Sequence, residues 1–211
     1  MDIRTDSKSI AVFAIFTSII IALEIFPIVG LTDFYTPVPG FTIDWTGIPI
    51  MIIFLGLGIV LSVLSVGIMW VFIAYRNFNG AAFKGLSEIL TLLGLIVAKL
   101  VLRNRDIDWK WTAGIYFIFA ATFRSIGMYF GNIMLFTLFG YMPFESAITY
   151  SIAYIPWNIL QAGINIFVGI IMYRMIPESL AIQAGLGKYR TSKDQQYEEI
   201  SEEELASDND D

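Results

Sequence analysis

Long apolar stretches recur along this chain of 211 residues, from Ile10 to Ile176. Several of them are about 20 residues long, which is the length that an α-helix needs to cross the hydrocarbon core of a bilayer. Hydrophobic residues make up 56% of the sequence and charged residues only 15%, a more apolar balance than soluble domains have. The sequence therefore predicts an all-α integral membrane protein that crosses the plasma membrane several times.

The number of spans depends on one ambiguous stretch, Gly47–Tyr75, which could form one tilted helix or two short helices broken near Gly56–Gly58 or Ser62–Ser65. Cytoplasmic loops accumulate lysine and arginine. Six spans place nine of these bases inside and two outside, whereas five spans place four inside and seven outside. We therefore predict six transmembrane helices with both termini cytoplasmic. The other four spans are expected at Ile10–Val29, which exceeds a signal-peptide core in length, and at Phe83–Leu102, Trp111–Phe139 and Ala147–Ile176.

The sequence divides into a membrane domain and a tail, and one long loop joins the first two predicted helices. Residues 1–176 are expected to form the six-helix membrane domain, and residues 177–211 a polar cytoplasmic tail. The last 18 residues hold nine acids and no base, which favours a solvated, disordered segment, with regulatory docking as the alternative. The long outer loop between helices 1 and 2, Gly30–Trp45, is rich in aromatic residues, so it is either a lid over a ligand or part of an interfacial aromatic belt.

Three ionisable residues fall inside predicted helices: Glu24, Glu88 and Arg124. Such side chains are costly in a bilayer and often mark a site or a pathway. Glu88 and Arg124 could also form a pair that neutralises both charges, which would be a structural role.

One face of the last predicted helix carries amides. Asn158 and Gln161 are three residues apart, and Asn165 follows four residues later, so all three share a face. Pro156 is expected to disturb the first turns of this helix. The amides could bond neighbouring helices, or they could recognise a neutral ring-shaped ligand between aromatic walls.

Small residues recur every fourth position along the first helix, at Ala14, Ser18 and Ala22. This pattern lets another helix approach closely. The approaching helix could belong to the same bundle, or it could belong to a second membrane protein.

The sequence lacks the residues that several kinds of chemistry require. The chain has no histidine and no cysteine, and it has no GxxxxGK[ST] phosphate-binding loop. It therefore cannot power itself with ATP, and histidine-dependent metalloprotease and serine-hydrolase sites are excluded. We expect a protein that is not an enzyme and that holds no cofactor or metal ion of its own.

Three segments resemble the membrane-embedded S components of energy-coupling factor (ECF) vitamin transporters, most of all the riboflavin-specific branch. TIDWTGIP at 42–49 is similar to L-D-F-S-D-I/V-P, and NGAAFKGLSE at 79–88 is similar to G-P-F-A-N-F-L-A-G, with Lys84 in place of Asn and Glu88 in place of Gly. The segment at 154–176 resembles an ending I-P-F-N-I-I-K-G…YRR, with Gln161 in place of Lys. Tyr129 lies in Met-Tyr-Phe, which is similar to Asn-Tyr-Phe in that branch.

This resemblance implies that the chain captures a vitamin at the outer face, under the first loop. It implies that the chain releases the vitamin inward with the help of an ATP-driven partner. Riboflavin would be the transported ligand, and the partners would be an ECF transmembrane coupling subunit, ATPase subunits and the lipid bilayer, with no nucleic acid. The implied docking face is Ala14, Ser18 and Ala22. The implied substrate-binding residues are Phe41, Asp44, Trp45, Lys84, Glu88, Tyr129, Asn158 and Gln161.

The sequence leaves three other functions open. The chain could be an S component for another small vitamin or heterocycle, since exchanging Lys for Gln161 and Asn for Lys84 rearranges the polar contacts. It could be a self-sufficient secondary transporter that couples through Glu24 and Glu88, or a scaffold that transports nothing.

Overall fold

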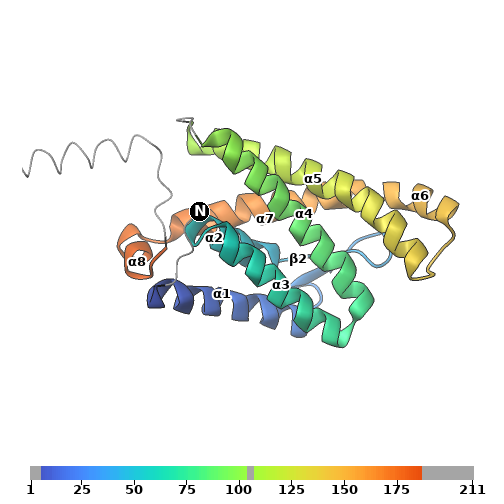
Figure 1. Cartoon of the computed structure of the whole chain (residues 1–211), viewed down its shortest axis with the longest axis horizontal. Coiled ribbons are helices and arrows are strands. Elements are labelled where there is room, and N and C mark those ends of the chain that lie inside the picture. The colour runs from blue at the N-terminus through green and yellow to red at the C-terminus, as the bar shows by residue number, and fades with distance from the viewer. Residues whose placement is uncertain (1–5, 104–106, 187–211) are drawn as a thin grey trace, which may run out of the picture.

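Helices dominate the computed structural model, which describes residues 6–103 and 107–186 (Figure 1). Five helices are long and apolar enough to cross a membrane. The prediction of an all-α, multi-pass membrane protein is therefore confirmed at this level. The five are α1 (Ser7–Ile25), α3 (Ile59–Arg76), α4 (Phe78–Leu102), α5 (Trp109–Leu138) and α7 (Ile155–Met175).

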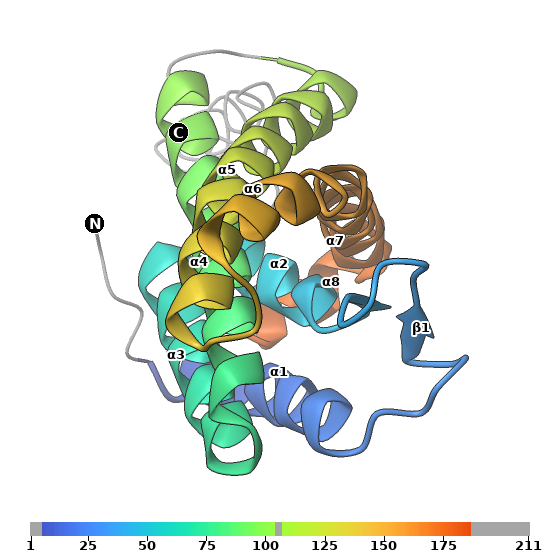
Figure 2. The ribbon, with the colours of Figure 1, turned by 90° about the vertical axis from the view of Figure 1, so that its right-hand side faces the viewer.

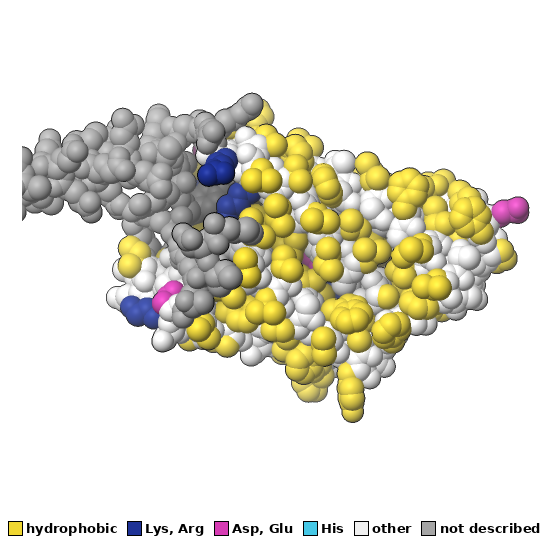
Figure 3. Space-filling view, in the orientation of Figure 1, with side chains coloured by type: hydrophobic (Ala, Val, Ile, Leu, Met, Phe, Trp, Pro, Cys, Tyr) yellow, Lys and Arg dark blue, Asp and Glu magenta, His cyan; other side chains and the backbone are white. Residues whose placement is uncertain are grey.

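The surface agrees with a membrane environment. Hydrophobic side chains cover much of the face seen in Figure 3, and the Lys and Arg side chains visible there lie near the end where α1 begins. Isoleucine, leucine, valine and phenylalanine side chains on α1, α3, α5 and α7 are exposed. Exposed apolar patches of this extent mark contact with lipid or with another protein.

The ambiguous stretch Gly47–Tyr75 forms two helices, as the two-helix alternative predicted. Helix α2 (Gly47–Gly56) ends at Leu57, and α3 begins after Gly58, whose φ of +97° lies in the left-handed region that favours glycine. At ten residues, α2 is only about 15 Å long, half of what a full span needs. The described residues therefore include five helices of spanning length, and α2 is half that length, where six transmembrane helices were predicted.

Helix α2 is short because the chain before it folds back into the bundle. Strands β1 (Asp33–Tyr35) and β2 (Thr42–Asp44) form an antiparallel hairpin in which Phe34 pairs with Ile43. Figure 1 shows β2 near the middle of the molecule, and Figure 2 shows the loop running between α1 and α7. Side chains from Gly47 to Phe54 are all buried, as expected of a helix that is apolar all round.

The predicted span Ala147–Ile176 is divided in two. Helix α6 (Phe144–Ile152) ends before Tyr154, and α7 starts at Ile155. Pro156 lies in the first turn of α7, where its missing N–H leaves no hydrogen bond unmade. Pro156 therefore lies at the start of a separate helix and does not disturb a longer one.

The first residues of the predicted tail fold onto the bundle. Helix α8 (Glu178–Gln183) follows α7, and the side chain of Leu186 is buried. Leu186 packs so closely on Gly56 that a Cβ atom added to Gly56 would lie 2.5 Å from the Cδ2 atom of Leu186. The acidic segment 194–211 lies outside the described residues.

Aromatic side chains from the loop, from three helices and from the junction between α6 and α7 meet at the end of the bundle that holds α6. We call Phe41, Phe83, Phe136, Tyr150 and Tyr154 the outer aromatic cluster, whose neighbouring ring centroids are 5.1–5.9 Å apart. The hydroxyl of Tyr154 donates a hydrogen bond of 2.7 Å to the carbonyl of Pro39. The cluster thus holds the tip of the long loop against the bundle, which argues against a disordered loop.

Single cysteines test the predicted orientation, because the chain has none of its own. We expect cysteines at Pro39 and Tyr141, which are exposed in two of the loops predicted to lie outside, to react with a membrane-impermeant maleimide in intact cells. Cysteines at Arg103 and Lys110, which are exposed near the opposite end, should react only after the membrane is permeabilised. Labelling of both Pro39 and Lys110 in intact cells would contradict the predicted topology.

Candidate functional site

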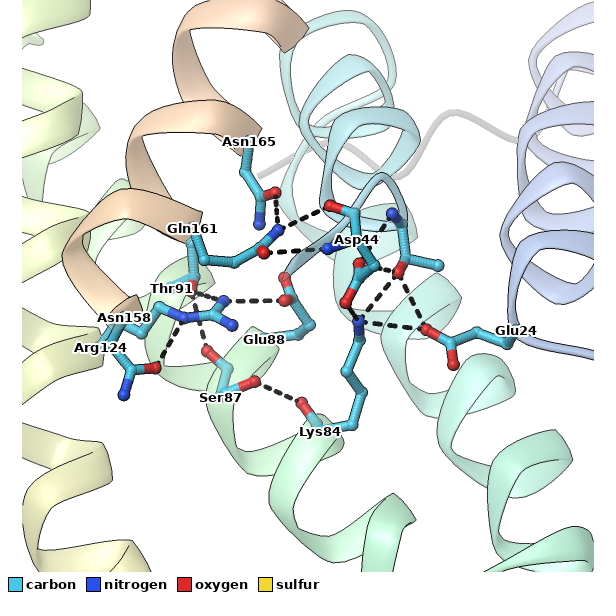
Figure 4. Close-up of polar contacts among 11 residues, drawn as sticks. Glu24, Asp44, Lys84, Ser87, Glu88, Thr91, Arg124, Asn158, Gln161 and Asn165 are labelled. Atoms are coloured by element: carbon cyan, nitrogen blue, oxygen red, sulfur yellow. Dashed lines mark hydrogen bonds and ion pairs between the residues drawn. The ribbon is translucent and has the colours of Figure 1, made fainter. Parts of the chain in front are cut away.

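Polar side chains from five elements converge inside the bundle (Figure 4). They come from the end of α1, the β2–α2 junction, α4, α5 and the inward face of α7, and most are buried. We call them the central polar cluster: Glu24, Asp44, Thr46, Lys84, Glu88, Thr91, Arg124, Asn158, Gln161 and Asn165. Three carboxylates and two bases lie within it.

Lys84 on α4 is the centre of one half of this cluster. Its ammonium contacts the carboxylate of Asp44, lies 3.2 Å from Oε1 of Glu24 and donates a 2.9 Å hydrogen bond to the hydroxyl of Thr46. Burial alone would raise the pKa of Asp44, but the Lys84 ammonium and the Thr46 hydrogen bonds hold that pKa below its ordinary value. Through these contacts Asp44 joins the outer loop to α4.

The other half is centred on Arg124 of α5. Its Nη1 atom is 2.8 Å from Oε1 of Glu88 and 2.9 Å from Oγ1 of Thr91, and its Nε atom is 3.2 Å from Oδ1 of Asn158. The Arg124 and Glu88 side chains are 3% and 1% exposed. The predicted Glu88–Arg124 pair is confirmed, and its hydrogen bonds offset the cost of burying two charges.

The amides of α7 take part in both halves. Asn158, Gln161 and Asn165 are all buried, as expected for residues that share the inward face. The Gln161 amide accepts a hydrogen bond from the Asp44 N–H (3.1 Å) and donates one to the Asp44 carbonyl (2.8 Å). Asn158 accepts from Arg124 and donates to the Tyr154 carbonyl. The predicted bond to a neighbouring helix is therefore confirmed for Asn158, which bonds Arg124 on α5, whereas Gln161 bonds strand β2.

The structure brings together five of the eight predicted substrate-binding residues and separates the aromatic three. Phe41 packs on Tyr154 in the outer aromatic cluster. Trp45 packs on Phe34 within the loop, and its indole N–H donates to the Leu31 carbonyl. Tyr129 packs on Phe130 along an apolar groove between α5 and α6. These three aromatic residues therefore do not form walls around the amides of α7.

Sequence reasoning did not assign Thr46 and Thr91 to the site. Thr91 lies three residues after Glu88, on the same face of α4, so helical spacing alone could have found it. The sequence indicated Thr46 only as one residue of the TIDWTGIP segment. Its contact with Lys84 depends on how the loop folds back into the bundle.

The small-residue stripe on α1 faces away from the bundle. Ala14, Ser18 and Ala22 are exposed, and the Ser18 hydroxyl bonds the Ala14 carbonyl on its own helix. The alternative that this stripe packs against helices of the same bundle is therefore wrong for the described part of the chain.

The central polar cluster carries groups that can bind a polar molecule. It offers carboxylates, an ammonium, a guanidinium and amides, and it includes neither histidine nor cysteine, which the whole chain lacks. In the described ranges, no group of three or more Asp or Glu side chains is arranged to hold a metal ion. No protein-family model matches the chain, and no curated protein matches it either.

The Arg124–Glu88 pair allows a test by charge removal. Arg124→Gln leaves the Glu88 carboxylate buried without its partner, which should lower the free energy of unfolding by about 3–5 kcal/mol. The double variant Arg124→Gln with Glu88→Gln removes both charges and should recover part of this loss. Denaturation in detergent measures both variants, and the exposed Arg103→Gln serves as the control. Equal stability of Arg124→Gln and wild type would contradict a buried ion pair.

Proposed function

We propose that this chain is the substrate-binding membrane subunit of an ECF-type vitamin importer, with riboflavin as the first candidate ligand. The observation that carries the proposal is the path of the outer loop, which enters the bundle and ends at the central polar cluster. A ligand arriving from outside would meet the loop first and the polar side chains directly beneath it. Discontinuous helices whose ends meet polar residues inside a bundle are typical of transporter binding sites.

The substrate contacts in this proposal come from Asp44, Lys84, Glu88 and Asn158, and Gln161 lies beside them; the structure brings all five together. Phe41 and Trp45 would close the site from the loop, whereas Tyr129 lies apart from it in the apolar groove between α5 and α6. The ligand itself acts as cargo, and the chain holds no cofactor. Because the chain has no phosphate-binding loop, the energy for release would come from a partner with ATPase subunits.

The first experiment is an absorbance spectrum of the protein purified from riboflavin-fed cells, with calorimetry on the ligand-free form. We expect flavin bands in the wild-type preparation. Asn158→Ala should weaken riboflavin binding roughly tenfold or more, because a lost hydrogen bond inside the site leaves a polar group unpaired. Gly114→Ala on α5, where a Cβ atom meets no neighbour, is the matched control. Failure of wild type to bind riboflavin would remove this ligand, and the same titration with other vitamins would follow.

A second prediction concerns the partner. Helix α1 presents Ala14, Ser18 and Ala22 outward, so a foreign helix could approach its backbone closely. We expect Ala14→Leu with Ser18→Leu to bind ligand normally but to lose uptake and co-purification with the ATPase module. The exposed pair Ile15→Leu and Ile19→Leu on the same helix changes shape little and is the control.

Secondary transport is the second candidate function, because the central polar cluster holds one carboxylate more than it holds bases. An unmatched carboxylate within a bundle could couple transport to a proton or another cation. Reconstitution in liposomes without any ATPase separates the two proposals. Uptake there, lost in Glu24→Gln, would favour a secondary transporter, and no uptake would favour the S component.

A further inference from the structure

The hydrogen bonds of Gln161 resemble those between two β-strands. Its amide oxygen accepts the Asp44 N–H, and its amide nitrogen donates to the Asp44 carbonyl, with distances of 3.1 Å and 2.8 Å. Two residues that exchange both main-chain bonds are the repeating unit of an antiparallel ladder. Strand β2 pairs with β1 along the chain, so a side chain of α7 takes the place of a further strand at Asp44.

Asn165 determines which way the Gln161 amide faces. The Gln161 nitrogen donates a second hydrogen bond, 2.7 Å long, to Oδ1 of Asn165. Turning the amide over would place its NH2 group against the Asp44 N–H and its oxygen against two carbonyl oxygens. The Nδ2 atom of Asn165 has no hydrogen-bond partner within the described residues, so Asn165 acts here as an acceptor.

Gly47 leaves the space in which Asn165 lies. A Cβ atom at position 47 would be 1.9 Å from Nδ2 of Asn165 and 2.1 Å from its Cγ atom. Any larger residue at the start of α2 must therefore push Asn165 away from its place beside Gln161. Both residues are buried, so little room exists for an alternative arrangement.

We propose that Gln161 is a positioning residue, which holds the Asp44 segment of the outer loop in place, and that Asn165 and Gly47 orient its amide. Both N–H groups of Gln161 are used within the protein, so neither is free to bind a ligand in this arrangement. Through Asp44, Gln161 fixes the carboxylate that contacts Lys84 and sets where α2 begins. This proposal refines the proposed function. Only its expected effect on ligand binding rests on the proposed function, and its expected effect on the loop does not.

Hydrogen–deuterium exchange of the ligand-free protein tests the positioning role directly. Peptides covering 31–46 should exchange at least tenfold faster in Gln161→Ala than in wild type, while peptides from α5 should be unchanged. Asn165→Ala should give the same change in a weaker form. Gly67→Ala is the matched control, because a Cβ atom at this exposed position of α3 meets no neighbour.

A double-variant cycle tests the part played by Gly47. Gly47→Ala should accelerate exchange of the loop in the wild-type background and add nothing further in the Asn165→Ala background, where the side chain it displaces is gone. Independent, additive effects would overturn the assignment of Gly47. This cycle also keeps the proposal testable if Gln161→Ala does not fold.

Riboflavin titration of the same variants separates this proposal from the proposed function. Faster loop exchange together with weaker binding is the expected result. Weaker binding with unchanged loop exchange would overturn the positioning role and make Gln161 a direct contact of the ligand. Faster loop exchange in a protein that binds no vitamin would leave the positioning role in place and remove the proposed function.

Discussion

The entry of a non-helical segment into the helix bundle determines how the polar side chains of this protein are arranged. Main-chain N–H and carbonyl groups cannot remain unpaired at membrane depth, so irregular backbone is tolerated there only where protein satisfies it. At Asp44 the N–H and the carbonyl are both paired with the Gln161 amide of α7, and strand β1 pairs with β2 along the rest of the hairpin. The same residue contributes a carboxylate, which requires a base, and Lys84 on α4 supplies it. One buried peptide thus links the loop to two helices.

The bilayer-spanning helices could be predicted because each satisfies its own backbone and needs only length and apolar composition. The pair of Glu88 and Arg124 could also be anticipated, since two opposite charges in neighbouring helices stabilise each other. The break at Gly58 was among the predicted positions, because glycine can adopt a left-handed conformation at little cost. These features depend on local sequence or on simple charge pairing.

The remaining features depend on contacts between residues far apart in the chain, which periodicity does not encode. The half length of α2 follows from how far β2 extends into the bundle, which the apolar run Ile48–Leu57 does not indicate. The division between α6 and α7 places Tyr154 beside Phe41 and Pro39, more than 100 residues away. Phe41, Trp45 and Tyr129 were expected around the amides, but the loop binds two of them into its own packing and that of the outer aromatic cluster.

The two halves of the central polar cluster differ in how far their charged side chains are exposed. The Arg124 and Glu88 side chains are almost completely buried, and each is held by several neighbours, so separating them would leave a charge in a medium of low dielectric constant. The side chains of Lys84, Glu24 and Asp44 are 17%, 16% and 12% exposed, and one ammonium serves two carboxylates. A small polar molecule could therefore take the place of one carboxylate at Lys84 without leaving a base unpaired. The Arg124 half is therefore the more firmly held of the two, and contacts in the Lys84 half can be exchanged at a lower cost.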